Sequence, residues 1–290
     1  MNYISVVIVN FNGSHFLDDC FNSISKNIKL EHEIIVFDNN SSDDSVKFIE
    51  TNYPNVKLIK SSENIGFGKG NNLAVRESNG DYILLLNNDT QILTNINEAI
   101  IALENNDKFG IISGKMLGKN KEYRLSSGYF PDLLRLFKIS SLYIKKGDFL
   151  KGNFKDEDIF FDVDWVEGSF MILKKAIWEK VEGFSSNYFM YGEDLDLCKK
   201  VKLLNYKVIY YPKIKYIHYG GYNSSRIHHI FRGLLEFQRN HTSSFTFEIS
   251  KFIINIGMFF RYIVFNFISI FSNSNLYQEK AKSCKSFLNS

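Results

Sequence analysis

The stretch Tyr82-Ile83-Leu84-Leu85-Leu86-Asn87-Asn88-Asp89 decides the fold of this chain. Its apolar residues run without alternation and then stop at three polar ones. A short, unbroken apolar run predicts a strand that is buried on both faces, as in the centre of an α/β sheet. Gly80-Asp81 marks the start of the run, which favours a short strand over a helix. The polar residues then lie at the carboxyl end of a central strand, where open α/β sheets bind ligands; taken alone, they could equally form a turn before the next helix.

Predicted strands and helices alternate around this central strand. Apolar and β-branched runs predict strands over residues 3–9, 33–37 and 56–60. Residues with helical spacing predict a helix after each of these strands. Such alternation with short links is typical of right-handed βαβ units on a mostly parallel sheet, so the predicted fold class is α/β.

The rest of the chain predicts an extension of this sheet, an insertion and a helical end. Residues 118–160 are irregular, charged and aromatic, which predicts an insertion at the mouth of the site. The other predicted strands cover 109–113, 161–165, 169–173, 207–211 and 214–218, and the other helices 95–105, 174–181 and 195–203. Two long aromatic-rich helices are expected within 226–272. We therefore expect a large α/β domain over 1–220 and a basic, aromatic-rich helical extension over 221–290.

Composition limits the class of protein and its compartment. At 290 residues, the chain fits one large domain or one domain with an appendage. Cys20, Cys198 and Cys284 have neither paired nor metal-like spacing, which favours a reducing compartment. No charged region precedes the first apolar run, so we expect no signal peptide and a cytoplasmic protein.

The charge is unevenly distributed along the chain. Residues 201–290 contain 8 Lys, 4 Arg and 3 Glu and carry a net charge of +9, so residues 1–200 carry −6. This asymmetry predicts a basic end that meets an anionic surface. No nucleic-acid-binding motif accompanies the basic end, so we expect a membrane surface and no nucleic acid.

Polar residues end three of the predicted strands: Asn10, Asp38 and Asn87–Asp89. The carboxyl ends of parallel strands lie at one edge of a sheet, so these residues indicate a site rather than scattered turns. A carboxylate at Asp38 could accept a hydrogen bond from a base N–H or a ribose hydroxyl. The alternative is that Asp38 only caps the next helix.

The glycine-rich run Gly66-Phe67-Gly68-Lys69-Gly70 follows the third strand. Its spacing does not match G-x-G-x-x-G, and no G-x-x-x-x-G-K-[ST] is present, which argues against a Rossmann dehydrogenase and a P-loop enzyme. The glycines would still let backbone N–H groups approach a phosphate at a helix start.

Acidic residues and one histidine supply the candidate chemistry. Glu193-Asp194-Leu195-Asp196 opens a helix, where acidic residues are favoured by the helix dipole alone. The apolar residues 189–192 before it would partly bury a carboxylate, which makes Asp194 a candidate general base. Asp196 points elsewhere and is expected to hydrogen-bond locally. His218 ends a strand; it could be structural, or it could complete an oxygen and nitrogen metal site with Asp89 for a nucleotide diphosphate.

Taken together, these blocks resemble family-2 glycosyltransferases of the GT-A fold. The similar blocks are 6–13, 38–43, 64–72, 86–89, 168–171, 183–184, 191–198 and His218. The most similar subgroup is the bacterial rhamnosyltransferase-like one, and the resemblance covers residues 3–220. It implies a Rossmann-like, mostly parallel sheet with helices on both faces.

The resemblance also implies roles for individual residues. Asp194 would be the catalytic base of an inverting transfer. Asp89, with His218, would bind a divalent cation, Mg²⁺ or Mn²⁺, although Asn87 replaces the first carboxylate of the family's DxD motif. The implied nucleotide-binding residues are Asn10, Phe11, Asp38, Asn64, Gly66, Lys69, Asn72 and Asn88, and the acceptor-side residues are Trp165 and Glu193.

The implied partners are a nucleotide-sugar donor, dTDP-rhamnose or a UDP-sugar, and a glycan or lipid-linked acceptor in cell-surface polysaccharide synthesis. The rival classes are a catalytically weak sugar-nucleotide-binding protein and a nucleotidyltransferase, although Asn10–Gly13 lacks the charge of a nucleotidyltransferase phosphate loop.

Residues 251–272 include a mostly apolar stretch, 252–272, that is long enough to span a bilayer. Arg261 in their middle argues against spanning. Polar residues fall within one helical arc and apolar ones opposite, which predicts a helix in an anionic membrane interface and an enzyme peripheral on the inner face of the plasma membrane. The alternative is that this helix packs on the catalytic domain or on the partner in a homodimer. The polar residues are Lys251, Asn255, Arg261, Asn266, Ser269 and Ser272.

Overall fold

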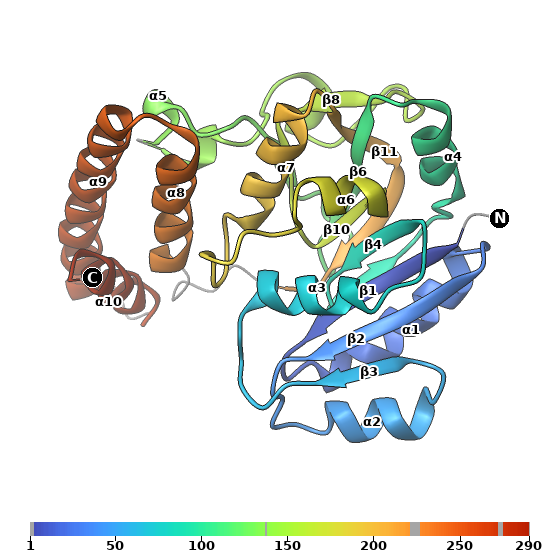
Figure 1. Ribbon diagram of the computed structural model, residues 1–290. Helices are drawn as coiled ribbons and strands as arrows, with labels where there is room; N and C mark the ends of the chain where they lie inside the picture. The colour runs from blue at the N-terminus through green and yellow to red at the C-terminus, as the bar shows by residue number, and fades with distance from the viewer. Residues whose placement is uncertain (1–2, 137, 221–226, 272–274, 290) are drawn as a thin grey trace. The chain divides into compact units, whose positions relative to one another are not determined.

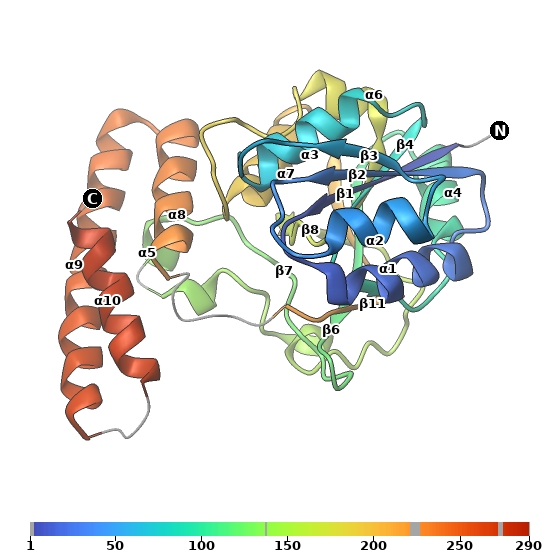
Figure 2. The ribbon, with the colours of Figure 1, turned by 90° about the horizontal axis from the view of Figure 1, so that it is seen from below.

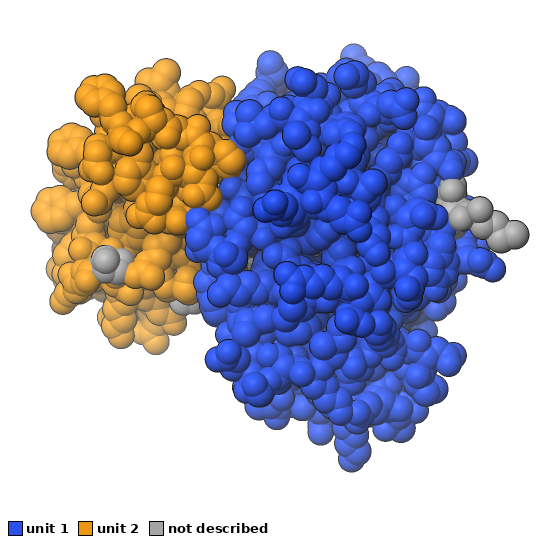
Figure 3. Space-filling model, viewed as in Figure 1, with its two compact units in different colours: residues 1–129, 143–189, 193–220 blue, residues 130–142, 190–192, 221–290 orange. Residues whose placement is uncertain are grey.

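The computed structural model describes residues 3–136, 138–220, 227–271 and 275–289. The chain divides into two compact units, which Figure 3 shows in blue and orange. Unit 1 comprises Met1–Tyr129, Tyr143–Phe189 and Glu193–Gly220, and unit 2 comprises Phe130–Leu142, Met190–Gly192 and Gly221–Ser290. The second unit therefore also takes two short segments from the region before residue 220.

A nine-stranded sheet organises unit 1 (Figure 1), in the order β3-β2-β1-β4-β10-β6-β11-β5, with β8 also paired to β11. The strands β1, β2, β3, β4, β6 and β11 run parallel, and β5, β8 and β10 run antiparallel to them. The strands are β1 (Ile4–Asn10), β2 (His32–Asp38), β3 (Lys57–Lys60), β4 (Tyr82–Leu86), β5 (Thr90–Ile92), β6 (Phe109–Leu117), β8 (Phe161–Val163), β10 (Phe170–Lys174) and β11 (Lys207–His218). The predicted α/β class with a mostly parallel sheet is confirmed.

The core explains why the central strands are unbroken apolar runs. Every residue of β1 and of β4 is buried, because helices cover both faces of the sheet. Figure 2 shows α1 and α2 on one side of the sheet and α3 and α6 on the other. The helices of unit 1 are α1 (Ser14–Asn27), α2 (Ser45–Asn52), α3 (Phe67–Arg76), α4 (Asn97–Asn105), α6 (Lys175–Lys180) and α7 (Glu193–Leu203).

Several predicted elements differ from the structure. The two strands expected over 207–211 and 214–218 form one strand, β11, whose register to β6 shifts between Tyr210 and Lys215. Pro212 lies in this bulge, where it removes no ladder hydrogen bond. The region 118–160 also contains short elements: β7 (Ser127–Gly128), which pairs with β9 (Trp165–Val166), α5 (Leu133–Leu136), and 3₁₀ turns at Ile139–Ser141 and Gly147–Leu150.

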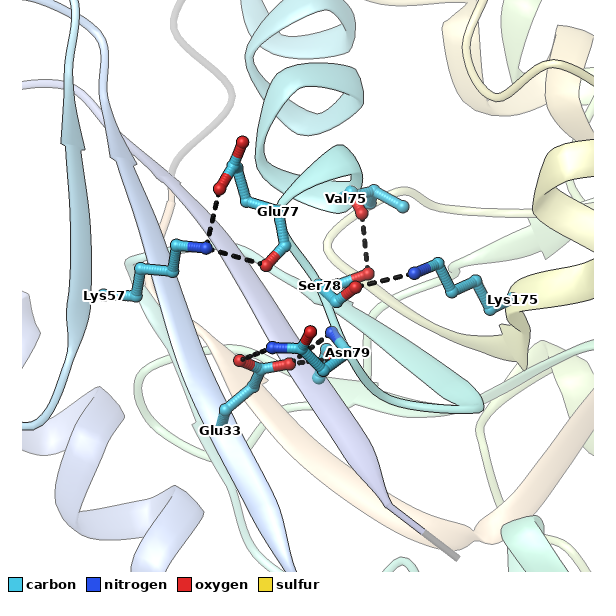
Figure 4. Close-up of polar contacts among 8 residues, drawn as sticks. Glu33, Lys57, Val75, Glu77, Ser78, Asn79 and Lys175 are labelled. Atoms are coloured by element: carbon cyan, nitrogen blue, oxygen red, sulfur yellow. Dashed lines mark hydrogen bonds and ion pairs between the residues drawn. The ribbon is translucent and has the colours of Figure 1, made fainter.

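A polar network fixes the amino ends of the central strands (Figure 4). Glu33 of β2 accepts hydrogen bonds from the Asn79 backbone N–H at 2.6 Å and from the Ser5 hydroxyl of β1 at 2.6 Å. Lys175 at the start of α6 donates to the Ser78 carbonyl at 2.6 Å. The edge of the sheet opposite to Asn10 and Asp38 is therefore occupied by structural contacts.

Unit 2 contains three long helices: α8 (Ile227–His241), α9 (Ser244–Phe271) and α10 (Leu276–Leu288). The two long helices expected within 226–272 are α8 and α9, whereas α10 was not predicted. Ser250, Ile254 and Met258 form the buried side of α9, which packs on α8 and α10.

Only part of the predicted polar arc of α9 is turned toward the other helices of unit 2. The Arg261 guanidinium lies over the Phe231 ring of α8, 4.9 Å from its centroid, and Asn266 and Ser269 are half-buried. Lys251 is exposed, and Ser272 lies outside the described residues. The opposite side of α9 is exposed and apolar: Phe252, Ile256, Phe259, Phe260, Ile263, Val264, Phe267, Ile270 and Phe271.

Candidate active site

The carboxyl ends of β1, β2 and β4 are joined by side-chain amides and a carboxylate. The Asn10 amide donates to Asp38 Oδ1 at 2.9 Å, and the Asn88 amide donates to Asn10 Oδ1 at 2.7 Å. The backbone N–H of Ser41 donates to the other Asp38 oxygen at 2.9 Å. Asn10 and Asp38 are buried, so their contacts fix the floor of this edge of the sheet.

A second asparagine chain shapes the loop before α3. Asn64 Oδ1 accepts from the Asn39 amide at 2.8 Å and from the Gly66 N–H at 3.0 Å. Gly66 has φ +89°, and a Cβ there would lie 2.5 Å from the Phe189 carbonyl oxygen. Only glycine fits this position without strain, and α3 therefore begins with Phe67.

Of the other predicted nucleotide-binding residues, two have exposed side chains and one is engaged in hydrogen bonds within the protein. Phe11 is 49% exposed, and Lys69 is exposed on α3, so both side chains are available to a ligand. Asn72 is not: its amide donates to the Phe184 carbonyl at 2.7 Å and accepts from the Phe184 N–H at 2.9 Å. We therefore assign Asn72 a structural role instead of the predicted nucleotide contact.

Asp89 and His218 meet at the ends of β4 and β11. His218 Nε2 lies 3.2 Å from Asp89 Oδ1, and the Asn87 amide lies 3.4 Å from the same nitrogen. Burial opposes the charged imidazole, but the hydrogen bond to Asp89 and the negative charge of its carboxylate outweigh this effect and raise the pKa of His218.

These side chains fit a divalent cation only in part. Among the described residues, no group of three or more His, Cys, Asp and Glu side chains is arranged to hold a metal ion. Asp89 and His218 supply two such groups, and the buried Oδ1 of the neighbouring Asn87 has no hydrogen-bond partner within the part of the chain that the structure describes. A carboxylate, an imidazole and an amide oxygen are acceptable ligands for Mn²⁺ or Mg²⁺, provided that a bound diphosphate supplies further oxygens.

Asp194 lies in the first turn of α7 and is held by two backbone groups. Its Oδ2 accepts from the Gly168 N–H at 3.2 Å, and its Oδ1 accepts from the Leu195 N–H at 2.9 Å. Ser169, the next residue after Gly168, accepts at its carbonyl from the Asn87 N–H at 3.1 Å. One turn of the chain between β9 and β10 thus connects the Asp194 carboxylate to the end of β4.

The two neighbouring acidic residues have different surroundings. Asp196 is buried and accepts from the Ser185 hydroxyl at 2.6 Å, so it hydrogen-bonds locally as predicted. Glu193 is 6% exposed, and its Oε2 has no hydrogen-bond partner among the described residues. Burial and the nearby Asp194 carboxylate raise the pKa of Glu193 to about 8, so it is largely neutral at pH 7.

Trp165, predicted on the acceptor side, is a core residue. It is 2% exposed, its indole N–H donates to the Tyr129 carbonyl at 3.0 Å, and Tyr143 packs against it edge-on. Its ring has no free face on which a sugar could stack, so we assign it to the support of β9.

The structure also brings residues to this edge that the sequence did not single out. A Cβ at Gly13 would lie 2.0 Å from the Asn88 amide nitrogen, so only glycine leaves room for the Asn88–Asn10 hydrogen bond. Arg124 reaches the His218 carbonyl at 3.2 Å and the Gly220 carbonyl at 2.8 Å. Gly13 stands within a quoted motif, which was a usable signal, whereas nothing in the sequence distinguishes Arg124 from other surface arginines.

The family of the chain follows from comparisons with known proteins. Residues 5–181, more than half of the chain, match Glycosyl transferase family 2, and residues 158–229 match a family described as the N-terminal domain of galactosyltransferase. The chain belongs to glycosyltransferase family 2 and is a glycosyltransferase. The resemblance seen in the sequence is therefore confirmed.

Relatives of known name indicate which glycosyltransferases this chain is similar to. Rhamnosyltransferase WbbL of Escherichia coli is 31% identical over 249 residues, which cover 77% of this chain and 85% of WbbL. An N-acetylglucosaminyl-diphospho-decaprenol L-rhamnosyltransferase of Mycobacterium tuberculosis is 22% identical over 243 residues, which cover 77% of this chain and 78% of that protein. The chain is thus similar to rhamnosyltransferases.

Solved structures show the GT-A fold. The mannosyltransferase PcManGT from Pyrobaculum calidifontis, in complex with GDP-Man and Mn²⁺, aligns with a TM-score of 0.58 at 13% identity and covers 99% of this chain and 84% of its own. GalNAc-T7 with UDP, GalNAc and Mn²⁺ aligns with a TM-score of 0.64 at 14% identity over 82% of this chain, which spans 48% of GalNAc-T7.

Proposed function

We propose that this glycosyltransferase moves a sugar from a nucleoside-diphosphate sugar to a hydroxyl of a glycan or lipid-linked acceptor, with inversion at the anomeric carbon. The proposal rests on one observation: hydrogen bonds connect the Asp194 carboxylate to the end of β4. Asp194 accepts from the Gly168 N–H, and the adjoining Ser169 carbonyl accepts from Asn87, next to Asp89. A fixed carboxylate thus lies beside the strand end that would hold the diphosphate.

The nucleoside would bind over the ends of β1 and β2. Asn10 and the Ser41 N–H each use one lone pair of Asp38, so each oxygen retains one for a base N–H. Phe11 is exposed beside this carboxylate and would line the base pocket. Asn88 at the end of β4 and the loop residues Asn64 and Gly66 would shape the rest of the nucleotide site; the Gly66 N–H itself donates to Asn64. The exposed Lys69 of α3 would contact a phosphate.

The proposed cofactor is a divalent cation, Mg²⁺ or Mn²⁺. Asp89 and His218 would hold it, with Asn87 Oδ1 beside them. Related folds that contain Mn²⁺ with a nucleotide support this assignment. When bound, the cation would supply positive charge to the leaving diphosphate. Since Asn87 replaces a carboxylate, the donor's own phosphates would supply much of the negative charge around the metal.

Asp194 would act as the general base. The acceptor oxygen attacks the anomeric carbon, its proton passes to Asp194, and the bond from that carbon to the diphosphate oxygen breaks with its electron pair. One such displacement inverts the anomeric centre. Glu193 lies beside Asp194, and we propose that in its neutral form it supports the acceptor side of the site.

We propose that unit 1 is the catalytic domain and that unit 2 holds the enzyme on an anionic membrane, on the inner face of the plasma membrane. By length and composition α9 could cross a bilayer, and only a small part of it is buried within the protein. Cations of the neighbouring helices lie beside two half-buried rings of α9: Arg239 lies 5.2 Å from the Phe247 ring, and Lys280 lies 5.6 Å from the Phe265 ring. An apolar face with basic flanks suits an anionic lipid interface. The alternative is that this face pairs with a second copy of the chain.

The names of the relatives support L-rhamnose as the sugar and a lipid diphosphate glycan as the acceptor. The test is release of nucleoside diphosphate from dTDP-rhamnose and from a panel of UDP-sugars, with and without a lipid-linked GlcNAc diphosphate acceptor. We expect acceptor-dependent release from dTDP-rhamnose, which Asp194→Asn should slow by at least about 10²-fold. Binding without release would favour the sugar-nucleotide-binding alternative, and release of pyrophosphate from a nucleoside triphosphate and a sugar phosphate would indicate a nucleotidyltransferase.

A further inference from the structure

The loop that follows β6 carries an arginine whose contacts lead to the Asp89–His218 pair. Arg124 Nη1 donates to the His218 carbonyl at 3.2 Å and to the Gly220 carbonyl at 2.8 Å. His218 is the last residue of β11, and Gly220 lies two residues beyond it, on the other side of Tyr219. The guanidinium therefore fixes the backbone that presents the His218 imidazole.

The Arg124 side chain is itself held in place. Its Nη2 lies 2.9 Å from Glu122 Oε1, and its Nε donates to the same oxygen at 3.2 Å. A Cβ at Gly118 would lie 1.8 Å from Glu122 Oε1 and 2.5 Å from Arg124 Nε. Glycine at 118 therefore leaves the space in which this ion pair lies, and the arginine side chain is only 24% exposed.

The backbone of Tyr219 and Gly220, which Arg124 holds, lies against the proposed metal ligands Asp89 and His218. A Cβ at Gly220 would lie 2.7 Å from Asp89 Oδ2 and 3.0 Å from His218 Nε2. The Tyr219 N–H donates to the Asp89 carbonyl at 2.9 Å. A displacement of this backbone by even an ångström would change the separation of Asp89 and His218 or cover them.

We propose that Arg124 is a positioning residue that sets the geometry of Asp89 and His218 for a divalent cation through the carbonyls of His218 and Gly220. The inference rests on the proposed metal site. Removal of a partner that orients a metal ligand typically lowers metal affinity by roughly 10–100-fold. A planar guanidinium can bridge two carbonyls and a carboxylate at fixed angles, whereas a lysine ammonium cannot reproduce all of these contacts.

The test is the affinity of the full-length protein for Mn²⁺, measured by electron paramagnetic resonance in the presence of dTDP, for wild type, Arg124→Ala, Arg124→Lys and Asp89→Ala. Arg76→Ala, at the exposed end of α3, is the matched control for loss of a cation. We expect Arg124→Ala to bind Mn²⁺ about 10–100-fold more weakly, Arg124→Lys to be intermediate, and Arg76→Ala to be unchanged.

Wild-type affinity in Arg124→Ala, together with loss of binding in Asp89→Ala, would overturn the role of Arg124 and leave the metal site intact. Equal affinity in wild type and Asp89→Ala would overturn the metal site itself. If Arg124→Ala does not fold, the test rests on Arg124→Lys. An Mn²⁺ affinity equal to that of wild type would contradict the proposal, and a lower Mn²⁺ affinity with an unchanged melting temperature would support it.

Discussion

The amide of Asn88 donates to the side-chain oxygen of Asn10 at 2.7 Å and so joins the ends of β4 and β1. The same Asn10 donates to Asp38 at the end of β2, so three strand ends share one hydrogen-bonded chain. Each side-chain amide is oriented by its hydrogen-bond partners, so a substitution at one strand end should also shift the side chains at the other two.

Gly13→Ala should weaken nucleotide binding. The added methyl would lie 2.0 Å from the Asn88 amide nitrogen, and the backbone of Gly13 has φ −112°, which alanine adopts freely. The effect is therefore steric, and loss of the half-buried Asn88–Asn10 hydrogen bond should cost about 1–3 kcal/mol, equivalent to roughly 5- to 150-fold in affinity. Calorimetric titration with dTDP and UDP measures it, and Ser14→Ala next to it is the control. An unchanged affinity for both nucleotides would show that the Asn88–Asn10 contact does not shape the pocket.

Asp194→Asn should lower turnover by about 10²–10⁴-fold and leave nucleotide affinity unchanged. Asp196→Asn should have the opposite profile, because Asp196 is buried and accepts from Ser185. Asparagine keeps only one acceptor oxygen, so either the Ser185 or the Tyr188 hydroxyl loses its bond to residue 196, which should lower the free energy of unfolding by about 1–3 kcal/mol. Single-turnover kinetics and urea unfolding of both variants separate the two roles. Near-normal turnover in Asp194→Asn would remove this residue from the mechanism.

Stability should fall as the pH rises, because of Glu193. Its pKa is raised from the ordinary 4.5 to about 8, so its neutral form favours the folded state. That contribution is fully present below the unfolded pKa and is lost as the pH rises through the folded one, by at most about 1.4 kcal/mol per pH unit. Glu193→Gln should therefore flatten the decrease between pH 5 and 9, whereas Glu179→Gln, exposed on α6, should not. Parallel curves for wild type and Glu193→Gln in urea unfolding would contradict the assignment.

EDTA should abolish transfer, and Mn²⁺ or Mg²⁺ should restore it. Asp89→Ala and His218→Ala should each raise the metal concentration that gives half-maximal activity by roughly tenfold or more, because each removes one of few protein ligands. The measurement is initial rate against free Mn²⁺ at saturating donor. Full activity in EDTA would exclude the cofactor, and the Asp89–His218 pair would then act on the diphosphate without a metal.

The exposed side of α9 should bind anionic vesicles. Phe259 is 53% exposed and Phe260 is 61% exposed, and each would contribute about 1.5–3 kcal/mol if it entered lipid. The double change Phe259→Glu with Phe260→Glu should lower sedimentation with phosphatidylglycerol vesicles by at least about tenfold. Leu203→Glu, which is 63% exposed at the end of α7, is the control. Dimerisation that the double change abolishes, without vesicle binding, would instead identify a second copy as the partner of α9.

The central strands could be predicted because their own residues indicate that they are buried on both faces. The strands β1 and β4 are unbroken apolar runs, and the polar residues after them lie at one edge as expected. The helix α1 was predicted because Leu17, Cys20, Phe21 and Ile24 recur at helical spacing and form its buried side. Such patterns depend on the residues themselves and need no distant partner.

Other features depend on partners far along the chain. Asn72 and Trp165 were predicted in the binding site, yet Phe184 and Tyr129 take up their polar groups. The strand β5 has three residues, Thr90–Ile92, too few for a period, and it exists because β11 pairs with it. Arg124 reaches His218 across 94 positions of sequence, and no local pattern encodes such a contact.

The strand order of the main sheet also bears on how the chain is synthesised. One side of β4 pairs with β1, which precedes it, but the other pairs with β10, which begins only at Phe170. While the ribosome is still adding the chain between Leu86 and Phe170, the outer edge of this strand remains unpaired. An apolar strand with an open edge is a template for intermolecular pairing. Until β10 is synthesised and pairs with β4, we therefore expect this edge of the nascent enzyme to be open to intermolecular pairing.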